Sequence, residues 1–380
     1  MNSIPYARQW LDTDDLKAIS ESLENNHLTQ GPKVADFEKA VASYCGSKYA
    51  VAVNSGTAAL HLACMAAGIN NDDEVITSPI TFVATSNAVL YCNARPVFAD
   101  VSPSTINLDP SNIEARVNSK TKAIIPVHFA GHPCDLSAIK KIADKHNLIV
   151  IEDAAHALGS EYKGSKIGSG KYSDLTILSF HAIKAITTGE GGMVLTNSEE
   201  MYEKMMMLRS HGITKDNSKM RKDLNQSWFY EMQYLGFNYR ITDFQCALGI
   251  SQLEKLDFYI KRRREIVDKY RKAFEPLQEI SFLEEKNDVF SAWHIFPILV
   301  EDRQSVFNKL RSRGIYVNVH YIPVYYQPYY REKFGYPQGL CPKAENYYEQ
   351  TLTLPLFPKL TDKEVDYIIE EVKNAIKKEQ

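Results

Sequence analysis

Short apolar runs alternate with helical patterns through residues 48–200. The apolar runs predict strands at 49–53, 74–77, 96–100, 122–127, 148–152, 174–180 and 192–196. Between the first five strands, the apolar spacing predicts helices at 58–67, 81–91, 110–117 and 136–146. Strands that alternate with helices in this way are typical of an α/β fold, in which helices cover both faces of a large, mainly parallel sheet.

The pattern changes in the second half of the chain. A polar loop at 214–226 precedes a long helical pattern at 243–274, and the last part, 290–380, has the mixed pattern of a smaller α+β unit. We therefore expect a large α/β domain with an N-terminal arm at 1–245 and a small C-terminal α+β domain at 246–380.

The composition argues against several classes of function. The formal net charge is −3, which argues against a nucleic-acid partner because such proteins usually carry a basic excess. The six cysteines form no C-x-x-C pair, so zinc-ribbon and redox motifs are excluded and no metal site is expected. We see neither a signal peptide nor an apolar run of membrane-spanning length, so we expect a cytoplasmic protein with no membrane partner.

Candidate chemistry lies where the predicted strands end, because parallel sheets bind ligands beyond the carboxyl ends of their strands. Ser55, Gly56 and Thr57 follow the first strand and open a helix. Small residues at a helix N-terminus can bind an anion, although the same tripeptide also suits a plain helix cap.

Asp153 and Lys184 follow two later strands. A buried carboxylate needs a partner, which is either a pyridine nitrogen or the start of a helix. A desolvated lysine has a lowered pKa that suits Schiff-base chemistry, although a lysine can also extend to the surface. Their spacing, with one strand between them, can place an amine and a carboxylate at opposite ends of a flat aromatic cofactor. Phe82, after another strand, could stack on its ring.

At these residues the chain resembles the DegT/DnrJ/EryC1/StrS family of nucleotide-sugar aminotransferases, which are fold-type-I enzymes that use pyridoxal 5′-phosphate (PLP). The resemblance covers essentially the whole chain. It is carried by LTQG at 28–31, SGTAAL at 55–60, EDAAH at 152–156, SFHAIK at 179–184, GFNYR at 236–240 and VHY at 319–321.

The resemblance implies roles for individual residues. Lys184, Asp153 and His156 would be catalytic: Lys184 would hold the cofactor covalently, Asp153 would pair with its pyridine nitrogen, and His156 would lie near its ring oxygen O3′. The further cofactor-binding residues would be Ser55, Gly56, Thr57 and Ser179 around the phosphate, Phe82 on the ring, and Asn238 from a neighbouring subunit. The implied substrate-binding residues are Tyr6, Thr29, Gln30, Arg240, His320 and Tyr321.

Asn238 acting on the neighbouring subunit's cofactor implies a homodimer with shared active sites. Within the family, the motifs are most similar to those of the PseC-type transaminases of pseudaminic acid biosynthesis. That group transfers an amino group from L-glutamate to C4 of a UDP-linked 2-acetamido-2,6-dideoxy-4-ketohexose. The alternatives are another nucleotide-linked keto sugar, aminated at C4 or C3 and linked to UDP or dTDP, and a PLP-dependent sugar dehydratase. Dehydratases of the family have His in place of Lys184, so aminotransfer is favoured.

Two further alternatives belong to other classes. A catalytically silent binding protein could share the fold, but Lys184 and Asp153 are both intact. A dinucleotide-binding dehydrogenase is excluded because no G-x-G-x-x-G follows the first strand.

Overall fold

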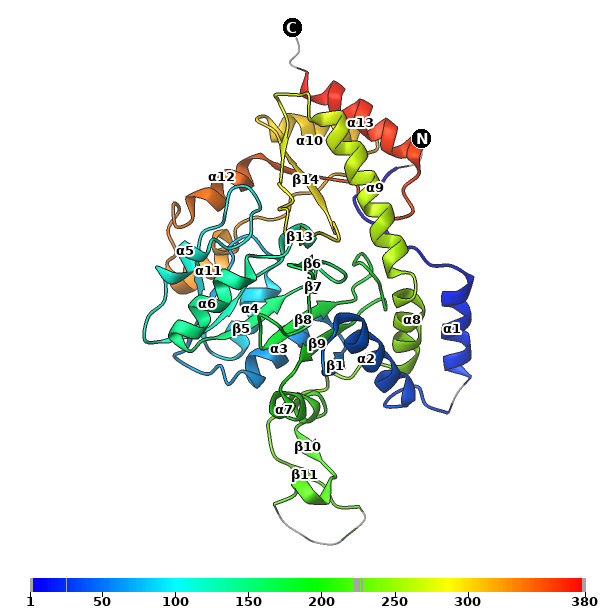
Figure 1. Cartoon of the computed structure of the whole chain (residues 1–380), viewed down its shortest axis with the longest axis vertical. Helices are drawn as coiled ribbons and strands as arrows, with labels where there is room; N and C mark the ends of the chain where they lie inside the picture. Colours follow the sequence, from blue (N-terminus) through cyan, green and yellow to red (C-terminus); the bar gives the residue numbers. More distant parts are fainter. Residues whose placement is uncertain (1–2, 25, 222–225, 227, 378–380) are drawn as a thin grey trace.

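The computed structural model describes residues 3–24, 26–221, 226 and 228–377. Within them, the chain is built around a seven-stranded sheet with the order β1-β9-β8-β5-β4-β2-β3 (Figure 1). Its strands are β1 (Tyr49–Val53), β2 (Glu74–Thr77), β3 (Arg95–Phe98), β4 (Thr121–Ile125), β5 (Ile149–Asp153), β8 (Leu175–Ser179) and β9 (Gly192–Thr196). β9 is antiparallel to both neighbours, and the other neighbouring strands are parallel. The predicted mainly parallel sheet is confirmed.

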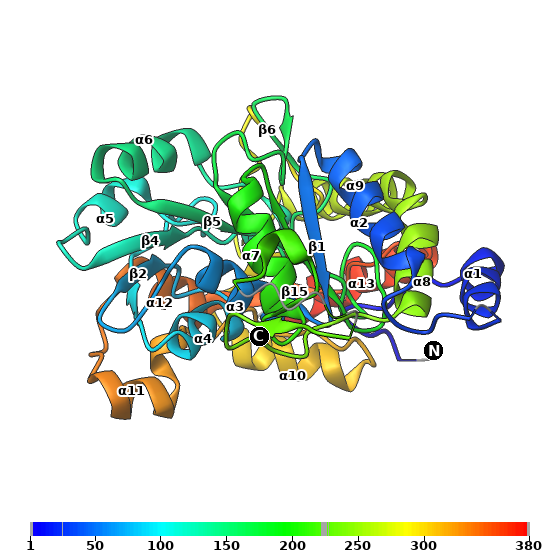
Figure 2. The same cartoon turned by 90° about the horizontal axis from the view of Figure 1, so that it is seen from below.

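Both faces of this sheet are buried under helices (Figure 2). Side chains alternate between faces along each strand, so Ala50 and Ala52 join one apolar cluster and Val51 and Val53 join the other. The first face is covered by α2 (Pro32–Cys45), α6 (Leu136–His146) and α8 (Asp243–Leu253). The second face is covered by α3 (Gly56–Ala66), α4 (Ala84–Tyr91) and α7 (Glu199–Arg209). This arrangement explains why the strands are nearly continuous apolar runs.

A third apolar cluster belongs to the C-terminal part of the chain. An antiparallel sheet of β12 (Ser281–Phe282), β14 (Phe296–Leu299) and β15 (Thr351–Leu354) packs there with α9 (Leu256–Phe274), α10 (Arg303–Ser312) and α13 (Asp362–Ile376). Ile4 joins the same cluster, and its backbone N–H donates to the Gly314 carbonyl at 2.8 Å. The N-terminal segment therefore reaches across to this α+β unit. The domain boundary after residue 245 stays a prediction.

The remaining elements are short. They are α1 (Thr13–Leu23), α5 (Pro110–Glu114), α11 (Pro328–Phe334), α12 (Pro342–Gln350), and the strands β6 (Glu161–Tyr162), β7 (Ser165–Lys166), β10 (Ile213–Thr214), β11 (Glu231–Met232) and β13 (Val289–Phe290). β10 and β11 form a two-stranded arm that projects from the body in Figure 1. The predicted polar loop at 214–226 includes residues 222–225, which lie outside the described residues. Within the described part of the chain, no helix has the length and apolar character needed to cross a bilayer.

The single long helix predicted at 243–274 is wrong, because α8 ends at Leu253 and α9 begins at Leu256. Side chains around the break all converge on the buried carboxylate of Asp15. Ser251 and Gln252 each donate a hydrogen bond to it at 2.7 Å, and the Lys255 amine lies 3.0 Å away. The break thus lets α8 pack on α1 and α2 while α9 turns toward α13.

Gly192 places the start of β9 directly against the start of α3. A Cβ at this position would lie 2.3 Å from the Ser55 carbonyl oxygen and 2.8 Å from the Gly56 nitrogen. These atoms belong to the backbone and cannot move independently of the helix, so any side chain at Gly192 displaces the first turn of α3.

We expect Gly192→Ala to lower the free energy of unfolding by about 1–3 kcal/mol and to speed hydrogen exchange in the first turn of α3. Urea unfolding and exchange mass spectrometry measure the two effects. Gly164→Ala is the control, because its φ of +72° strains alanine while its Cβ would meet nothing within 4 Å. Unchanged exchange at α3 in Gly192→Ala would contradict this account.

Candidate active site

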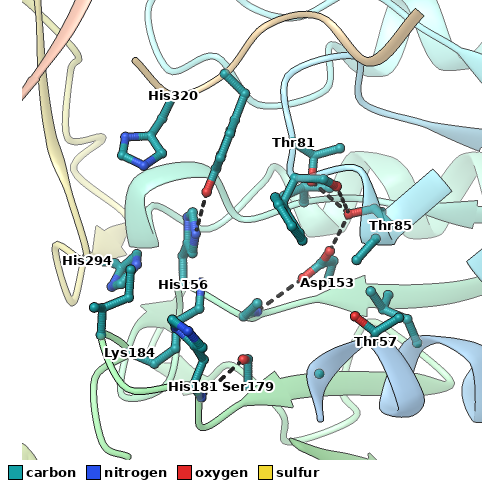
Figure 3. Close-up of a pocket in the computed structure, with 18 of the residues that line it drawn as sticks. Thr57, Thr81, Thr85, Asp153, His156, Ser179, His181, Lys184, His294 and His320 are labelled. Carbon is teal, nitrogen blue, oxygen red and sulfur yellow. Dashed lines mark hydrogen bonds between the residues drawn. The ribbon is translucent and has the colours of Figure 1, made fainter. Parts of the chain in front are cut away.

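A cavity of about 570 Å³ opens at the carboxyl ends of the central strands (Figure 3). Its wall also includes side chains from the C-terminal unit and from the N-terminal segment. Most of the predicted site residues line it: Tyr6, Ser55, Gly56, Thr57, Phe82, Asp153, His156, Ser179, Lys184, His320 and Tyr321. Segments from very different parts of the chain therefore form one site, as the strand-end rule predicts.

Lys184 lies in the turn after β8, where its backbone N–H donates to the His181 carbonyl at 2.9 Å. Burial lowers the pKa of Lys184 to about 8, and the carboxylate of Asp153 acts in the opposite direction. Among the described residues that line the cavity, Lys184 is the one lysine or arginine. Roughly a tenth of the amine is therefore uncharged at pH 7, far more than for an ordinary lysine, and is available as a nucleophile or base.

Asp153 is the last residue of β5 and is only 4% exposed. The Thr85 hydroxyl donates to its Oδ2 at 2.7 Å, and the Ala155 N–H donates to its Oδ1 at 3.2 Å. Burial raises the pKa of Asp153, while these two donors and the nearby Lys184 lower it. The side chain is thus held in a fixed orientation by neutral donors, and its charge is left for a ligand.

Three histidines form the wall near Lys184. The His156 and His294 rings lie with their centroids 4.3 Å apart, and His320 Nδ1 lies 2.9 Å from the Thr353 hydroxyl. Burial holds the pKa of His156 and of His294 well below the usual histidine value and lowers the pKa of His320 to about 4. All three imidazoles are therefore neutral at pH 7, so they can each donate and accept a hydrogen bond without adding charge.

The far end of the cavity is the N-terminus of α3. Ser55 caps this helix by accepting a hydrogen bond from the Ala58 N–H at 3.1 Å. The first N–H groups of a helix have no partners inside it and attract anions. Ser179 packs so close that a Cβ on Gly56 would lie 3.0 Å from its side chain. The 55–57 segment can therefore be both a helix cap and an anion-binding site, because Ser55 caps the helix and the cavity faces the same helix end.

Thr29, Gln30, Asn238 and Arg240 are not among the residues that line the cavity. The 28–31 segment instead contacts the chain just after the 236–240 motif. Thr29 forms a backbone bridge with Thr242, and the Asp243 N–H donates to the Leu28 carbonyl at 3.0 Å. We call the described residues 28–31 and 236–243 the outer patch; it lies beside the cavity rather than inside it.

Several cavity residues were missed by the sequence analysis: Thr81, Thr85, Glu190, His294 and Asn318. Thr81 and Thr85 could have been predicted from the sequence, because two hydroxyl residues one helical turn apart follow the end of a predicted strand. Their hydroxyls lie 2.7 Å apart. His294 and Asn318 could not have been predicted in this way, since they come from the C-terminal unit and reach the cavity only through tertiary packing.

The fold is that of solved PLP-type aminotransferases. PseC of Helicobacter pylori, an aminotransferase involved in the biosynthesis of pseudoaminic acid, aligns with a TM-score of 0.91 and 34% identity over 99% of both chains. The putative sugar aminotransferase Spr1654 of Streptococcus pneumoniae aligns in its PLP form with a TM-score of 0.91 and 32% identity over 98% of both chains. A PMP form of the same protein is also known. The predicted fold class is confirmed.

The chain belongs to the DegT/DnrJ/EryC1/StrS aminotransferase family, which it matches over residues 9–373. The spore coat polysaccharide biosynthesis protein SpsC of Bacillus subtilis is 43% identical over 381 residues, which are 98% of this chain and 97% of that protein. The UDP-4-amino-4,6-dideoxy-N-acetyl-beta-L-altrosamine transaminase of Campylobacter jejuni is 39% identical over 373 residues, which are 96% of this chain and 95% of that protein. The predicted family and its aminotransferase class are confirmed.

The cavity fits PLP, the cofactor of this family. It presents an amine, a buried carboxylate and a helix N-terminus on different walls. The Phe82 ring lines it and is 62% exposed, so its surface is available to another flat ring. His156 Nδ1 is buried and has no hydrogen-bond partner within the described residues, which leaves one polar atom for a ligand.

From the raised pKa of Asp153 we predict how the stability of the cofactor-free protein depends on pH. Below the ordinary aspartate pKa of 3.8 the carboxyl is protonated in both the folded and the unfolded protein, so it contributes nothing to the free energy of unfolding. Above the raised pKa of the folded state the carboxyl is charged in both, and its buried charge destabilises the fold. We expect Asp153→Asn to melt at a higher temperature than the parent at neutral pH, with the difference vanishing as the pH falls below 3.8. Thermal melts across this range test it, with Asp288→Asn, whose side chain is 48% exposed, as the control. A less stable Asp153→Asn at neutral pH would refute the argument.

The lowered pKa of Lys184 is measurable without the cofactor. The protein is labelled briefly with an acylating reagent at a series of pH values, and the labelled lysines are identified by mass spectrometry. The labelling rate of Lys184 should have its pH midpoint near 8, whereas an ordinary lysine has a pKa of 10.5. Asp153→Asn should move this midpoint lower, since the carboxylate favours the charged amine. If Lys184 labels in step with the surface lysines, its amine is not desolvated.

Proposed function

We propose that the chain is a PLP-dependent aminotransferase that moves the amino group of L-glutamate to C4 of a UDP-linked 2-acetamido-2,6-dideoxy-4-ketohexose. The observation that carries the proposal is one cavity that combines the partly buried amine of Lys184, the buried carboxylate of Asp153 and the N-terminus of α3. The sugar assignment is supported by the likeness to the Campylobacter jejuni transaminase and to PseC.

In this proposal, residues at the strand ends hold the cofactor. Lys184 would attach to it, Asp153 would keep a proton on its pyridine nitrogen, and Phe82 would stack on its ring. The remaining proposed cofactor contacts are Ser55, Gly56, Thr57 and Ser179 at the phosphate and His156 at the ring oxygen. When bound, PLP supplies an electron-withdrawing ring that stabilises negative charge beside the reacting carbon.

The protein's own residues would then supply the proton transfers. Lys184 Nζ would take the proton from Cα of glutamate, and in the second half of the reaction it would deliver a proton at C4 of the sugar. The pKa of about 8 suits an amine that must both accept and donate near neutral pH. Asp153 keeps its charge aimed at the ring because Thr85 and Ala155 hold both of its oxygens.

The substrate-side residues divide into two groups. Tyr6 and His320 line the cavity and can contact a sugar directly. Thr29, Gln30, Asn238 and Arg240 lie in the outer patch, and we propose that they serve the cavity of a second subunit in a homodimer. The support is that none of these four motif residues lines the cavity of their own chain, and that the 28–31 segment contacts the chain at Thr242, just after the 236–240 motif. A cytoplasmic location stays a prediction.

A second candidate is an aminotransferase for another nucleotide-linked keto sugar, bearing the ketone at C4 or C3 and linked to UDP or dTDP. It is favoured by the spore coat relative, whose 43% identity exceeds the 39% of the altrosamine transaminase. Dehydration is the weaker alternative, because Lys184 is present where dehydratases of the family have His.

The test is release of 2-oxoglutarate from glutamate by the PLP-loaded protein, with the UDP-linked 4-keto sugar and a dTDP-linked 3-keto sugar compared as acceptors. We expect faster turnover with the first. Lys184→Ala should lower turnover at least about 1,000-fold because it removes the proton-transferring amine, and Lys184→Arg, which keeps the charge, should be equally inactive. Full turnover in Lys184→Ala would overturn the proposal, and a preference for the second acceptor would favour the alternative.

A further inference from the structure

His156 has an asymmetric environment. Its Nε2 lies 3.2 Å from the Tyr321 hydroxyl, the contact drawn as a dashed line at His156 in Figure 3. Its Nδ1 is buried and has no partner among the described residues, and the whole side chain is only 7% exposed. One ring nitrogen is therefore held by the protein, and the other is unpaired within the described residues.

The two partners come from different parts of the fold. His156 follows β5 of the large sheet, whereas Tyr321 lies between β14 and β15 of the C-terminal unit. The Tyr321 segment is anchored on both sides: the Tyr347 hydroxyl donates to the His320 carbonyl at 2.9 Å, and the Val324 N–H donates to the Pro79 carbonyl at 2.9 Å. The hydroxyl of Tyr321 is thus brought to His156 by tertiary packing.

The His156 ring is also fixed in orientation. The His294 ring lies 4.3 Å away at an interplanar angle of 38°, and the Tyr321 ring lies nearly parallel to it at 25°. Gly131 packs against the His156 backbone so tightly that a Cβ would lie 2.9 Å from the His156 carbonyl oxygen. The two ring contacts and the Tyr321 hydroxyl thus hold the imidazole in one orientation, with Nε2 toward Tyr321.

A neutral imidazole carries one N–H, and the hydrogen bond at one nitrogen decides which nitrogen has it. Burial keeps the pKa of His156 well below its usual value, with Lys184 and His320 acting in the same direction, so the ring is neutral. Burial raises the pKa of Tyr321, so its hydroxyl keeps its proton and can donate. If this hydroxyl donates to Nε2, the histidine N–H must be on Nδ1.

We propose that Tyr321 is a positioning residue that acts through His156: its hydroxyl donates to Nε2 and so holds the N–H on Nδ1, where it donates to the phenolic oxygen of the cofactor. The opposite arrangement would leave Nδ1 as an acceptor facing an oxygen that is itself an acceptor when ionised. This inference rests on the proposed function, and it replaces the direct contact with substrate that the family resemblance implies for Tyr321.

The first test uses Tyr321→Phe and two measurements that do not depend on turnover. Loss of one hydrogen bond should weaken PLP binding to the cofactor-free protein by roughly 3- to 10-fold. The pH midpoint of the bound cofactor's visible absorbance should rise by roughly half a unit to one unit, because a donor at the ring oxygen stabilises its negative charge. Tyr325→Phe is the matched control, since it also removes a tyrosine hydrogen bond, to Glu345 at 2.6 Å, but does not line the cavity.

The decisive test repeats Tyr321→Phe in a His156→Ala background. If Tyr321 acts through His156, its hydroxyl has nothing left to orient, and the second change should alter neither the absorbance midpoint nor PLP affinity beyond the effect of His156→Ala alone. If Tyr321 instead contacts the sugar, Tyr321→Phe should raise the KM for the sugar equally in both backgrounds and leave the absorbance unchanged. That result would overturn the inference.

The outcomes separate this inference from the proposed function. A parent protein that binds no PLP, or that binds it without Lys184, would refute the proposed function. A parent protein that behaves as proposed, with a Tyr321→Phe spectrum identical to its own, would refute only the role of Tyr321. Melting temperatures of all variants identify any loss of signal that comes from misfolding.

Discussion

The active site depends on keeping a partly buried amine and a buried carboxylate in one cavity without letting them neutralise each other. Lys184 and Asp153 influence each other's pKa, yet the described ion pairs include none between them. Direct pairing would use the charge of both groups and close the space between them. The sheet prevents this because Asp153 ends β5, whereas Lys184 lies in the turn after β8, and Asp153 is already held by Thr85 and Ala155. The separation leaves room for a flat, polar ring that takes both as partners.

Holding the site open requires rigid support, and this comes from close backbone packing. Gly192 allows β9 to touch the first turn of α3, Gly56 allows that turn to touch Ser179, and Gly131 allows the 129–131 turn to touch His156. Each glycine lies where a side chain would collide with the site's own backbone or side chains. The positions of the phosphate end and of the histidine wall are therefore set by contacts that no larger residue permits.

The sequence predicted most features that depend on neighbouring residues along the chain, and few of those that depend on contacts between distant segments. Alternating apolar runs predicted the sheet, and the strand-end rule placed Lys184, Asp153 and the 55–57 segment in one site, because these residues directly follow their strands. His294 and Asn318 could not be found in this way, since a separate unit with its own apolar cluster carries them to the cavity. The helix break at 254–255 was missed for the same reason, because the side chains beside it are held by the carboxylate of Asp15, which is distant in the sequence.

The charge of the cavity connects the proposed substrate with the proposed dimer. Glutamate and a UDP-sugar are anions, but Lys184 is the one lysine or arginine among the described cavity residues, and the proposed chemistry needs its amine uncharged for part of the cycle. The histidines that surround it are neutral. The cations that bind the diphosphate and the donor carboxylates would then come from outside this cavity, and in the proposed dimer Arg240 of the outer patch would supply one of them to the neighbouring subunit. On this argument, the proposed dimer would complete the charge that both substrates need, as well as supplying Asn238 to the cofactor.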